Sequence, residues 1–122
     1  MKVAIVGAGI SGCLLANILD SASIDVSIFE QALACGGRAN TIDTGWGHCD
    51  LGATIVPVQK NDLFTFMQGL CRQGLASKWP EKIFVSRQSS SLKQSLERYQ
   101  TDREYYVFNR KMNEICKHWT KN

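Results

Sequence analysis

The sequence has no CxxC pair, and its five cysteines are odd in number and spread along the chain. A disulfide framework or a zinc site needs thiols paired at short spacings, so neither is expected. A reduced, cytoplasmic protein fits this cysteine usage best. His48 and Cys49 could suggest a pair of metal ligands, but adjacent side chains seldom converge on one ion and no second pair lies nearby in the sequence. We therefore expect no metal site.

Charge of one sign and long apolar runs are also scarce. The formal net charge is only +3, and the basic residues are scattered singly instead of clustering with aromatics, which argues against nucleic-acid binding. The apolar run from Lys2 to Leu19 resembles a secretory signal, but glycines, a serine and an asparagine interrupt it. It is too broken to span a bilayer. We expect neither a nucleic-acid partner nor a membrane partner.

What the sequence does contain is the composition of a globular protein. Hydrophobic residues make up 44% and aromatics 9% of the chain, which excludes disorder, collagen-like repeats and a coiled coil. A chain of 122 residues has the usual length of one domain. The sequence therefore predicts a single domain over residues 1–122.

The N-terminal segment has the pattern of a strand, a glycine turn, a helix and a second strand. The β-branched run Lys2–Val6 predicts a buried strand, and apolar residues at helical spacing predict a helix from Ile10 to about Ser21. Residues 25–29 predict the second strand. Because two parallel strands need a crossover, we expect a βαβ unit and an α/β, Rossmann-like fold with a parallel sheet.

The rest of the chain gives weaker patterns. Short strands are predicted near residues 41–43 and 54–58. Two further strands are predicted at residues 82–87 and 105–108, with a polar loop or an exposed helix start at 86–95 between them. A helix is predicted from Asn61 or Asp62 to near Gly74, and a second one from near Asn109 through Trp119.

The final predicted helix is of the kind that normally delivers the chain to another parallel strand, and the sequence ends there. We therefore expect a fold truncated at its C-terminal side. A second polypeptide or self-association could complete the sheet, because open strand edges and apolar faces rarely stay in water.

Gly7, Gly9 and Gly12 form a GxGxxG motif between the first predicted strand and the first predicted helix. In a dinucleotide site such glycines allow a tight turn, a close approach of backbone N–H groups to the pyrophosphate, and close packing of the helix on the strand. Ile10 and Ser11 belong to the same turn, at a helix N-terminus whose dipole favours phosphate. We assign all five residues to cofactor binding.

Glu30 stands at the end of the second predicted strand, 18 residues after Gly12. A carboxylate at this place can accept hydrogen bonds from the hydroxyls of an adenosine ribose and repels a 2′-phosphate. The motif with Glu30 therefore favours NAD or FAD over NADP. The glycine motif and the glutamate serve both cofactors, so they leave the choice open.

The run Glu30-x5-Gly36-Gly37-Arg38-x2-Thr41 resembles the second signature of FAD-dependent amine oxidases and related flavoproteins. The segments Asp50-Leu51-Gly52-Ala53 and Gly74-Leu75-x3-Trp79-Pro80 are similar to those of the renalase-like branch. The resemblance implies FAD as cofactor, with NAD as the alternative, and places Gly36, Gly37 and Arg38 against phosphate and ribitol. It also implies oxidation of an amine or a dihydronicotinamide.

Members of that family are typically about three times as long, and no residue here matches a catalytic or substrate-binding role. His48 and the aromatics Trp46, Trp79, Tyr105 and Tyr106 are assigned to packing or surface roles. The leading hypothesis is the FAD-binding portion of a renalase-like oxidoreductase. The alternatives are a noncatalytic nucleotide-binding module, half of a two-chain enzyme, and an inactive fragment.

Overall fold

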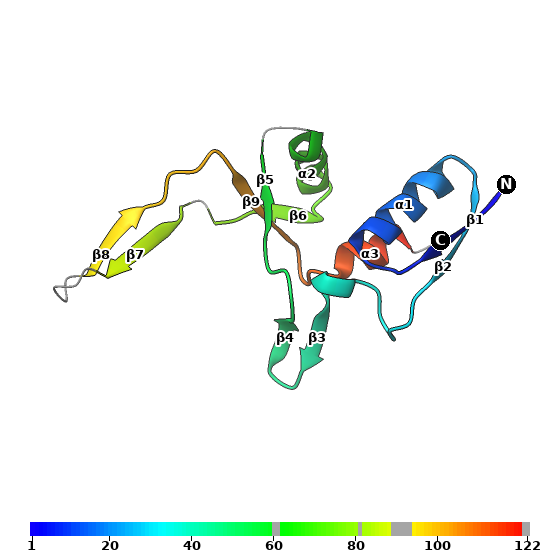
Figure 1. The fold of residues 1–122 in the computed structure, drawn as a ribbon, viewed down its shortest axis with the longest axis horizontal. Helices are drawn as coiled ribbons and strands as arrows, with labels where there is room; N and C mark the ends of the chain where they lie inside the picture. The colour runs from blue at the N-terminus through cyan, green and yellow to red at the C-terminus, as the bar shows by residue number, and fades with distance from the viewer. Residues whose placement is uncertain (60–61, 81, 89–93, 121–122) are drawn as a thin grey trace. The chain divides into compact units, whose positions relative to one another are not determined.

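The computed structural model describes residues 1–59, 62–80, 82–88 and 94–120 (Figure 1). The chain forms two compact units. Unit 1 comprises Met1–Thr54 with Phe108–Asn122, and unit 2 comprises Ile55–Val107. That the whole chain acts as one domain stays a prediction.

Unit 1 begins with the predicted βαβ arrangement. Strand β1 (Lys2–Val6) leads into helix α1 (Ile10–Ser21), which returns the chain to strand β2 (Asp25–Phe29). The two strands pair in parallel from Lys2 opposite Asp25 to Val6 opposite Phe29. These bounds and the parallel pairing confirm the prediction. The α/β, Rossmann-like fold class is likewise confirmed.

The two faces of the β1–β2 sheet differ in burial. Ile5 is buried, and its methyl group lies beside Gly12 at the start of α1. On the other face, Val6 is 90% and Phe29 60% exposed. Because successive side chains of a strand point to opposite faces, α1 covers one face of the sheet and leaves the other exposed, with Val6 and Phe29 as its large apolar side chains.

The remainder of unit 1 consists of a short 3₁₀ helix η1 (Gly37–Ala39), a hairpin of β3 (Thr41–Thr44) with β4 (Gly47–Asp50), and helix α3 (Glu114–Trp119). Figure 1 shows α3 beside α1, and buried Cys13 of α1 and Cys116 of α3 are in thiol contact there. Strand β4 was not predicted, because its glycine-rich sequence looked like a loop.

Helix α3 begins later than predicted. The sequence favoured a start near Asn109, but Arg110 has a φ of 72°, in the left-handed region that a helix cannot include. Asn113 is the residue that precedes the helix. The predicted apolar face is correct, because Met112, Ile115, Cys116 and Trp119 are all buried.

Unit 2 is built on helix α2 (Asp62–Arg72) and short strands. One sheet has the strand order β5 (Val56–Val58), β9 (Glu104–Phe108), β6 (Ala76–Lys78). A separate antiparallel hairpin joins β7 (Phe84–Gln88) and β8 (Gln94–Arg98). Among the residues with described side chains, the buried ones that fill this unit are Val58, Met67, Leu70, Ala76 and Tyr106.

The prediction of a loop or helix start at residues 86–95 is wrong where the structure describes it. Ser86 pairs with Leu96 in the β7–β8 hairpin, and residues 94 and 95 belong to β8. Backbone hydrogen bonds hold such a ladder whatever the side chains, so a polar Ser/Gln sequence gave no strand signal. Residues 89–93 lie outside the described part.

Among the described residues, no helix has the length and apolar character needed to cross a membrane.

Candidate functional site

Three segments of unit 1 line one groove of about 1040 Å³, which we call the glycine groove. The segments are the end of β1 with the start of α1, the turn that contains η1, and the turn after β4. The lining residues are Val6, Gly7, Gly9, Ile10, Ser11, Gly12, Gly36, Gly37, Arg38, Ala39, Asn40, Leu51, Gly52 and Ala53. The groove brings together every predicted site residue except Glu30.

The backbone of the first glycine turn, residues 7–12, forms part of the groove surface. Gly7 has a φ of 98° and donates its N–H to the carbonyl oxygen of Phe29 at 2.7 Å, which ties the turn to β2. A Cβ atom on Gly12 would lie 2.1 Å from the carbonyl oxygen of Gly7. A Cβ on Gly9 would meet nothing within 4 Å. Gly12 thus serves packing, whereas Gly9 borders open space.

The N-terminus of α1 opens on this groove. The first residues of the helix, Ile10, Ser11 and Gly12, all line it, and the helix has no acidic residue in its first turn. No described side chain caps the helix at Gly9. The first N–H groups of a helix have no partner within the helix and carry about half a positive charge together. This end of α1 is therefore suited to an anion.

The second glycine turn, residues 36–39, lies directly against the first. Gly36 donates its N–H to the carbonyl oxygen of Ala8 at 2.8 Å and forms a parallel bridge with Gly9. A Cβ on Gly37 would lie 3.4 Å from the Cα of Gly9. The two turns that the sequence singled out separately are thus one structure.

Arg38 is the only charged residue that lines the groove in the described chain. Its side chain is exposed, and no described carboxylate pairs with it. Its backbone is fixed, because Ala53 donates to its carbonyl oxygen at 2.9 Å and Gly52 packs on the same atom. A guanidinium left available beside a helix N-terminus can form paired hydrogen bonds with phosphate oxygens.

Glu30 does not line the groove, but its carboxylate bonds to the first glycine turn. Its carboxylate accepts the N–H of Ala32 at 2.8 Å and that of Ala8 at 2.7 Å. These two hydrogen bonds hold the pKa of Glu30 below its usual range, so the carboxylate is ionised at neutral pH. The backbone N–H of Gln31 also contributes a hydrogen bond, and an ionised carboxylate offers about four acceptor positions, so room is left for a further donor. In the structure Glu30 anchors the first glycine turn.

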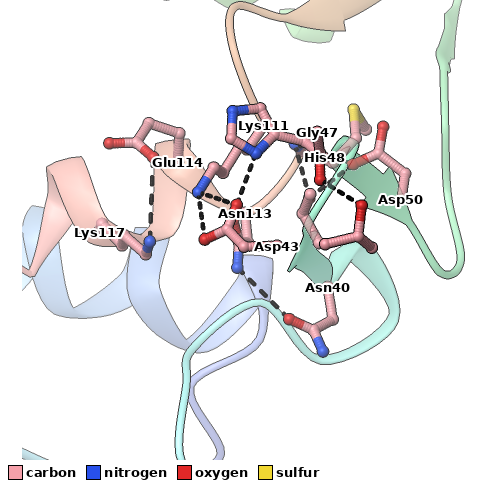
Figure 2. A network of polar contacts seen from close by, with 12 residues as sticks. Asn40, Asp43, Gly47, His48, Asp50, Lys111, Asn113, Glu114 and Lys117 are labelled. Atoms are coloured by element: carbon pink, nitrogen blue, oxygen red, sulfur yellow. Dashed lines mark hydrogen bonds and ion pairs between the residues drawn. The ribbon is translucent and has the colours of Figure 1, made fainter.

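The other sequence candidates lie elsewhere. His48 contacts Asp43 at 2.5 Å on the β3–β4 hairpin (Figure 2). Asp43 also pairs at 2.7 Å with Lys111, which lies in the segment before α3. Trp46, at the hairpin tip, is fully exposed. Tyr106 is buried and donates to Glu104 at 2.7 Å. Over the described residues, no three His, Cys, Asp or Glu side chains come together in a way that could hold a metal ion.

The sequence model of the NAD(P)-binding Rossmann-like domain matches residues 5–70, which is more than half of the chain and includes both glycine turns. The chain belongs to this family. Among curated proteins, it is 39% identical over 67 residues to the 4,4'-diapophytoene desaturase (4,4'-diaponeurosporene-forming) of Staphylococcus aureus strain bovine RF122 / ET3-1. The enzyme of strain Newman matches equally well, also at 39% over 67 residues.

Among solved structures, wild-type putrescine oxidase bound to putrescine matches 84% of this chain at 28% identity with a TM-score of 0.58. A double mutant of that oxidase with redesigned cofactor binding matches 83% of this chain at 29% identity, with a TM-score of 0.59. The chain spans 22% of the oxidase and 13% of the desaturase.

Proposed function

We propose that the glycine groove binds FAD and that the chain is the FAD-binding part of a flavin-dependent oxidoreductase. The observation that carries this proposal is that the α1 N-terminus and Arg38, which pairs with no described carboxylate, meet on one groove whose described lining has no carboxylate. Both groups attract the pyrophosphate of a dinucleotide. A volume of about 1040 Å³ is at the upper end for ligand pockets, as an extended cofactor requires.

The second glycine turn favours FAD over NAD. A GxGxxG motif followed by an acidic residue is common to both cofactors. The addition of Gly36, Gly37 and Arg38 resembles the flavoprotein signature, and these residues face the same groove. Glu30 would accept a hydrogen bond from the adenosine ribose with its remaining acceptor capacity. Its ionised carboxylate also disfavours the 2′-phosphate of NADP.

The proposed activity is oxidation of an amine or a dihydronicotinamide, as in the renalase-like branch. Similarity to a putrescine oxidase supports the amine, and similarity to a desaturase supports the wider class of oxidoreductases. A bound flavin would supply the hydride acceptor. The described residues would bind and orient it, and none of them is assigned a catalytic role. The five free thiols fit a reduced compartment such as the cytoplasm.

The proposal is tested by titrating FAD with the whole chain and following flavin fluorescence. Arg38→Gln removes the cation of the glycine groove without breaking a described ion pair. Arg103→Gln is the matched control, because Arg103 is an exposed arginine that lines a different groove, in unit 2. We expect Arg38→Gln to weaken FAD binding by about tenfold, which is about 1.4 kcal/mol, and Arg103→Gln to leave it unchanged.

Equal effects of the two arginine variants would contradict this location of the site. Competition with NAD and NADP in the same titration orders the cofactors: FAD is expected to bind most tightly and NADP least. A chain that prefers NAD would refute the choice of flavin but keep the groove.

A second candidate is a nucleotide-binding module that pairs with another polypeptide, with or without catalysis. The observation that favours it is the open face of the β1–β2 sheet, where Val6 and Phe29 are exposed. Phe29→Ser should abolish such pairing and leave FAD affinity intact, because the Phe29 side chain does not line the glycine groove. The variant could still co-purify with a second chain or still self-associate in sedimentation. Either result would contradict this role for the face. A clean monomer before and after the change points to an inactive fragment or an independent module.

A further inference from the structure

The glycine groove is held from behind by a residue far away in the sequence. Asn113 precedes α3 and is only 2% exposed. Its side-chain Nδ2 donates to the carbonyl oxygen of Cys35 at 3.4 Å. It also donates to Oδ1 of Asn40 at 3.3 Å (Figure 2). These two acceptors stand on either side of the second glycine turn. One carboxamide therefore bridges both ends of that turn.

The contact between Asn113 and the turn is also steric. A Cβ on Gly36 would lie 2.7 Å from the Cβ of Asn113, so the two backbones approach as closely as a missing side chain allows. Gly36 has a φ of 126° and donates its N–H to the carbonyl oxygen of Ala8 in the first glycine turn. Any shift of Asn113 would reach the pairing between the two turns.

The segment that carries Asn113 is itself fixed to the hairpin. The N–H of Met112 donates to Oγ1 of Thr41 at 3.1 Å and to Oδ1 of Asp50 at 3.4 Å. Thr41 in turn donates to Asp50 at 2.5 Å. The first residue of β3 and the last residue of β4 thus both bind the backbone of Met112. These hydrogen bonds fix the position of the adjacent Asn113 relative to the hairpin.

We propose that Asn113 is a positioning residue of the glycine groove, which sets the second glycine turn against the first and so sets the affinity for the dinucleotide. This inference rests on the proposed function and deepens it. Asn113 lies outside residues 5–70, the part that the family model matches. The site of this chain would thus depend on a segment beyond the family's own motif.

The chemistry requires a donor at this position. Both atoms that Nδ2 faces are oxygens, and Oδ1 of Asn113 is buried without a hydrogen-bond partner among the described residues. The side chain therefore acts here through its N–H groups. A carboxylate of the same shape would turn two attractions into two repulsions, and an apolar side chain would leave two acceptors unsatisfied.

The test compares Asn113→Asp, Asn113→Leu and the control Glu114→Gln in the whole chain. The control replaces a carboxyl group by an amide at the next residue, whereas Asn113→Asp replaces an amide by a carboxyl group. The described ion pair of Glu114 with Lys117 spans 3.9 Å. Amide hydrogen exchange of Gly36 without cofactor reports the turn itself. FAD titration at pH 8 and at pH 5 reports the consequence for binding.

At pH 8 we expect both Asn113 variants to exchange the Gly36 amide about tenfold faster and to bind FAD about tenfold more weakly than Glu114→Gln. At pH 5 the Asp variant should recover part of both losses. Its buried carboxyl, raised in pKa by the two oxygens, becomes protonated and can donate one hydrogen bond. The Leu variant should not recover at either pH.

Three results would overturn the proposal. One is normal exchange at Gly36 in both variants, and another is no pH recovery in the Asp variant. The third is faster exchange that spreads equally over β1 and β2, since that reports general loss of stability and not a shifted turn. If the unaltered chain binds no FAD, the proposed cofactor fails, but the exchange of Gly36 still decides whether Asn113 positions the turn.

Discussion

Two grooves in the described part of the chain are built in opposite ways. The glycine groove of unit 1 is lined largely by backbone and small side chains, with Arg38 as its one charged residue among those described. The groove of unit 2, which we call the polar groove, measures about 540 Å³. Its lining is rich in charged side chains of both signs, which are Lys78, Lys82, Arg98, Asp102, Arg103 and Glu104.

The charges of the polar groove partly satisfy one another. Lys78 pairs with Glu104 at 2.8 Å, and Glu104 also accepts the hydroxyl of buried Tyr106. In the glycine groove the donors are backbone N–H groups and a guanidinium that no described carboxylate neutralises. The comparison teaches that an anion site depends less on the number of charges than on donors that the fold leaves available.

The largest effect is expected from Gly12→Ala. The added Cβ would lie 2.1 Å from the carbonyl oxygen of Gly7, so helix α1 must move away from β1. We expect a loss of about 3 kcal/mol in the free energy of unfolding of unit 1, the upper range for overpacking. Denaturant unfolding followed by circular dichroism measures it. A fully stable variant would contradict the close packing of α1 on the first glycine turn.

Gly9→Ala separates binding from stability. Its φ of −73° suits alanine, and the new methyl group enters open space, so the fold should be retained. The methyl would block the approach of a pyrophosphate, and FAD affinity should fall by about tenfold. The matched control is Gly69→Ala in α2, where an added Cβ also meets nothing within 4 Å. A similar loss of affinity in both variants would show that the effect is not local.

Glu104→Gln should change the polar groove alone. Burial first and the Glu104 carboxylate second raise the pKa of Tyr106 to about 12. Stability from this pair is present below the ordinary tyrosine pKa and is lost as the pH rises through about 12. The variant should lower the Tyr106 pKa and cost about 1 kcal/mol of unfolding free energy, with Asp102→Asn as control. Tyrosinate absorbance and denaturant unfolding measure the two effects. Reduced FAD binding in Glu104→Gln would break the distinction between the grooves.

The smallest effect concerns the β3–β4 hairpin. The hydrogen bond from Lys111 first and that from His48 second hold the pKa of Asp43 below its usual range. The contribution of this cluster to stability is therefore present above the ordinary carboxyl pKa and is lost as the pH falls through the depressed value. Asp43→Asn should remove this part of the acid dependence in denaturant unfolding. The acid unfolding curve would be unchanged by the substitution if the cluster adds nothing.

The sequence was informative where the signal was local. The apolar periodicity of Lys2–Phe29 predicted both strands, the helix and their parallel pairing. The GxGxxG motif pointed to five of the lining residues, and the resemblance to the flavoprotein signature added Gly36, Gly37 and Arg38. Strands β4, β6 and β8 were missed because they are short or polar and depend on backbone pairing with distant partners.

Within the site, two features depended on contacts over long separations. Glu30 anchors the first glycine turn through Ala8, 22 residues away, in addition to any role toward a ribose. Asn113 reaches Cys35 across 78 residues and Asn40 across 73. No periodicity or motif encodes such a contact, and its only local signal is an asparagine before an amphipathic helix, a common helix-capping residue.

The central claim is that the glycine groove, and not the polar groove, takes the dinucleotide. Amide-resolved NMR during addition of FAD to the whole chain tests it most directly. Our account predicts that the shifted amides cluster in residues 7–12, 36–40 and 51–53, with the amides of residues 98–105 unmoved. Shifts centred on residues 98–105, or no shift at the two glycine turns at saturating FAD, would contradict it.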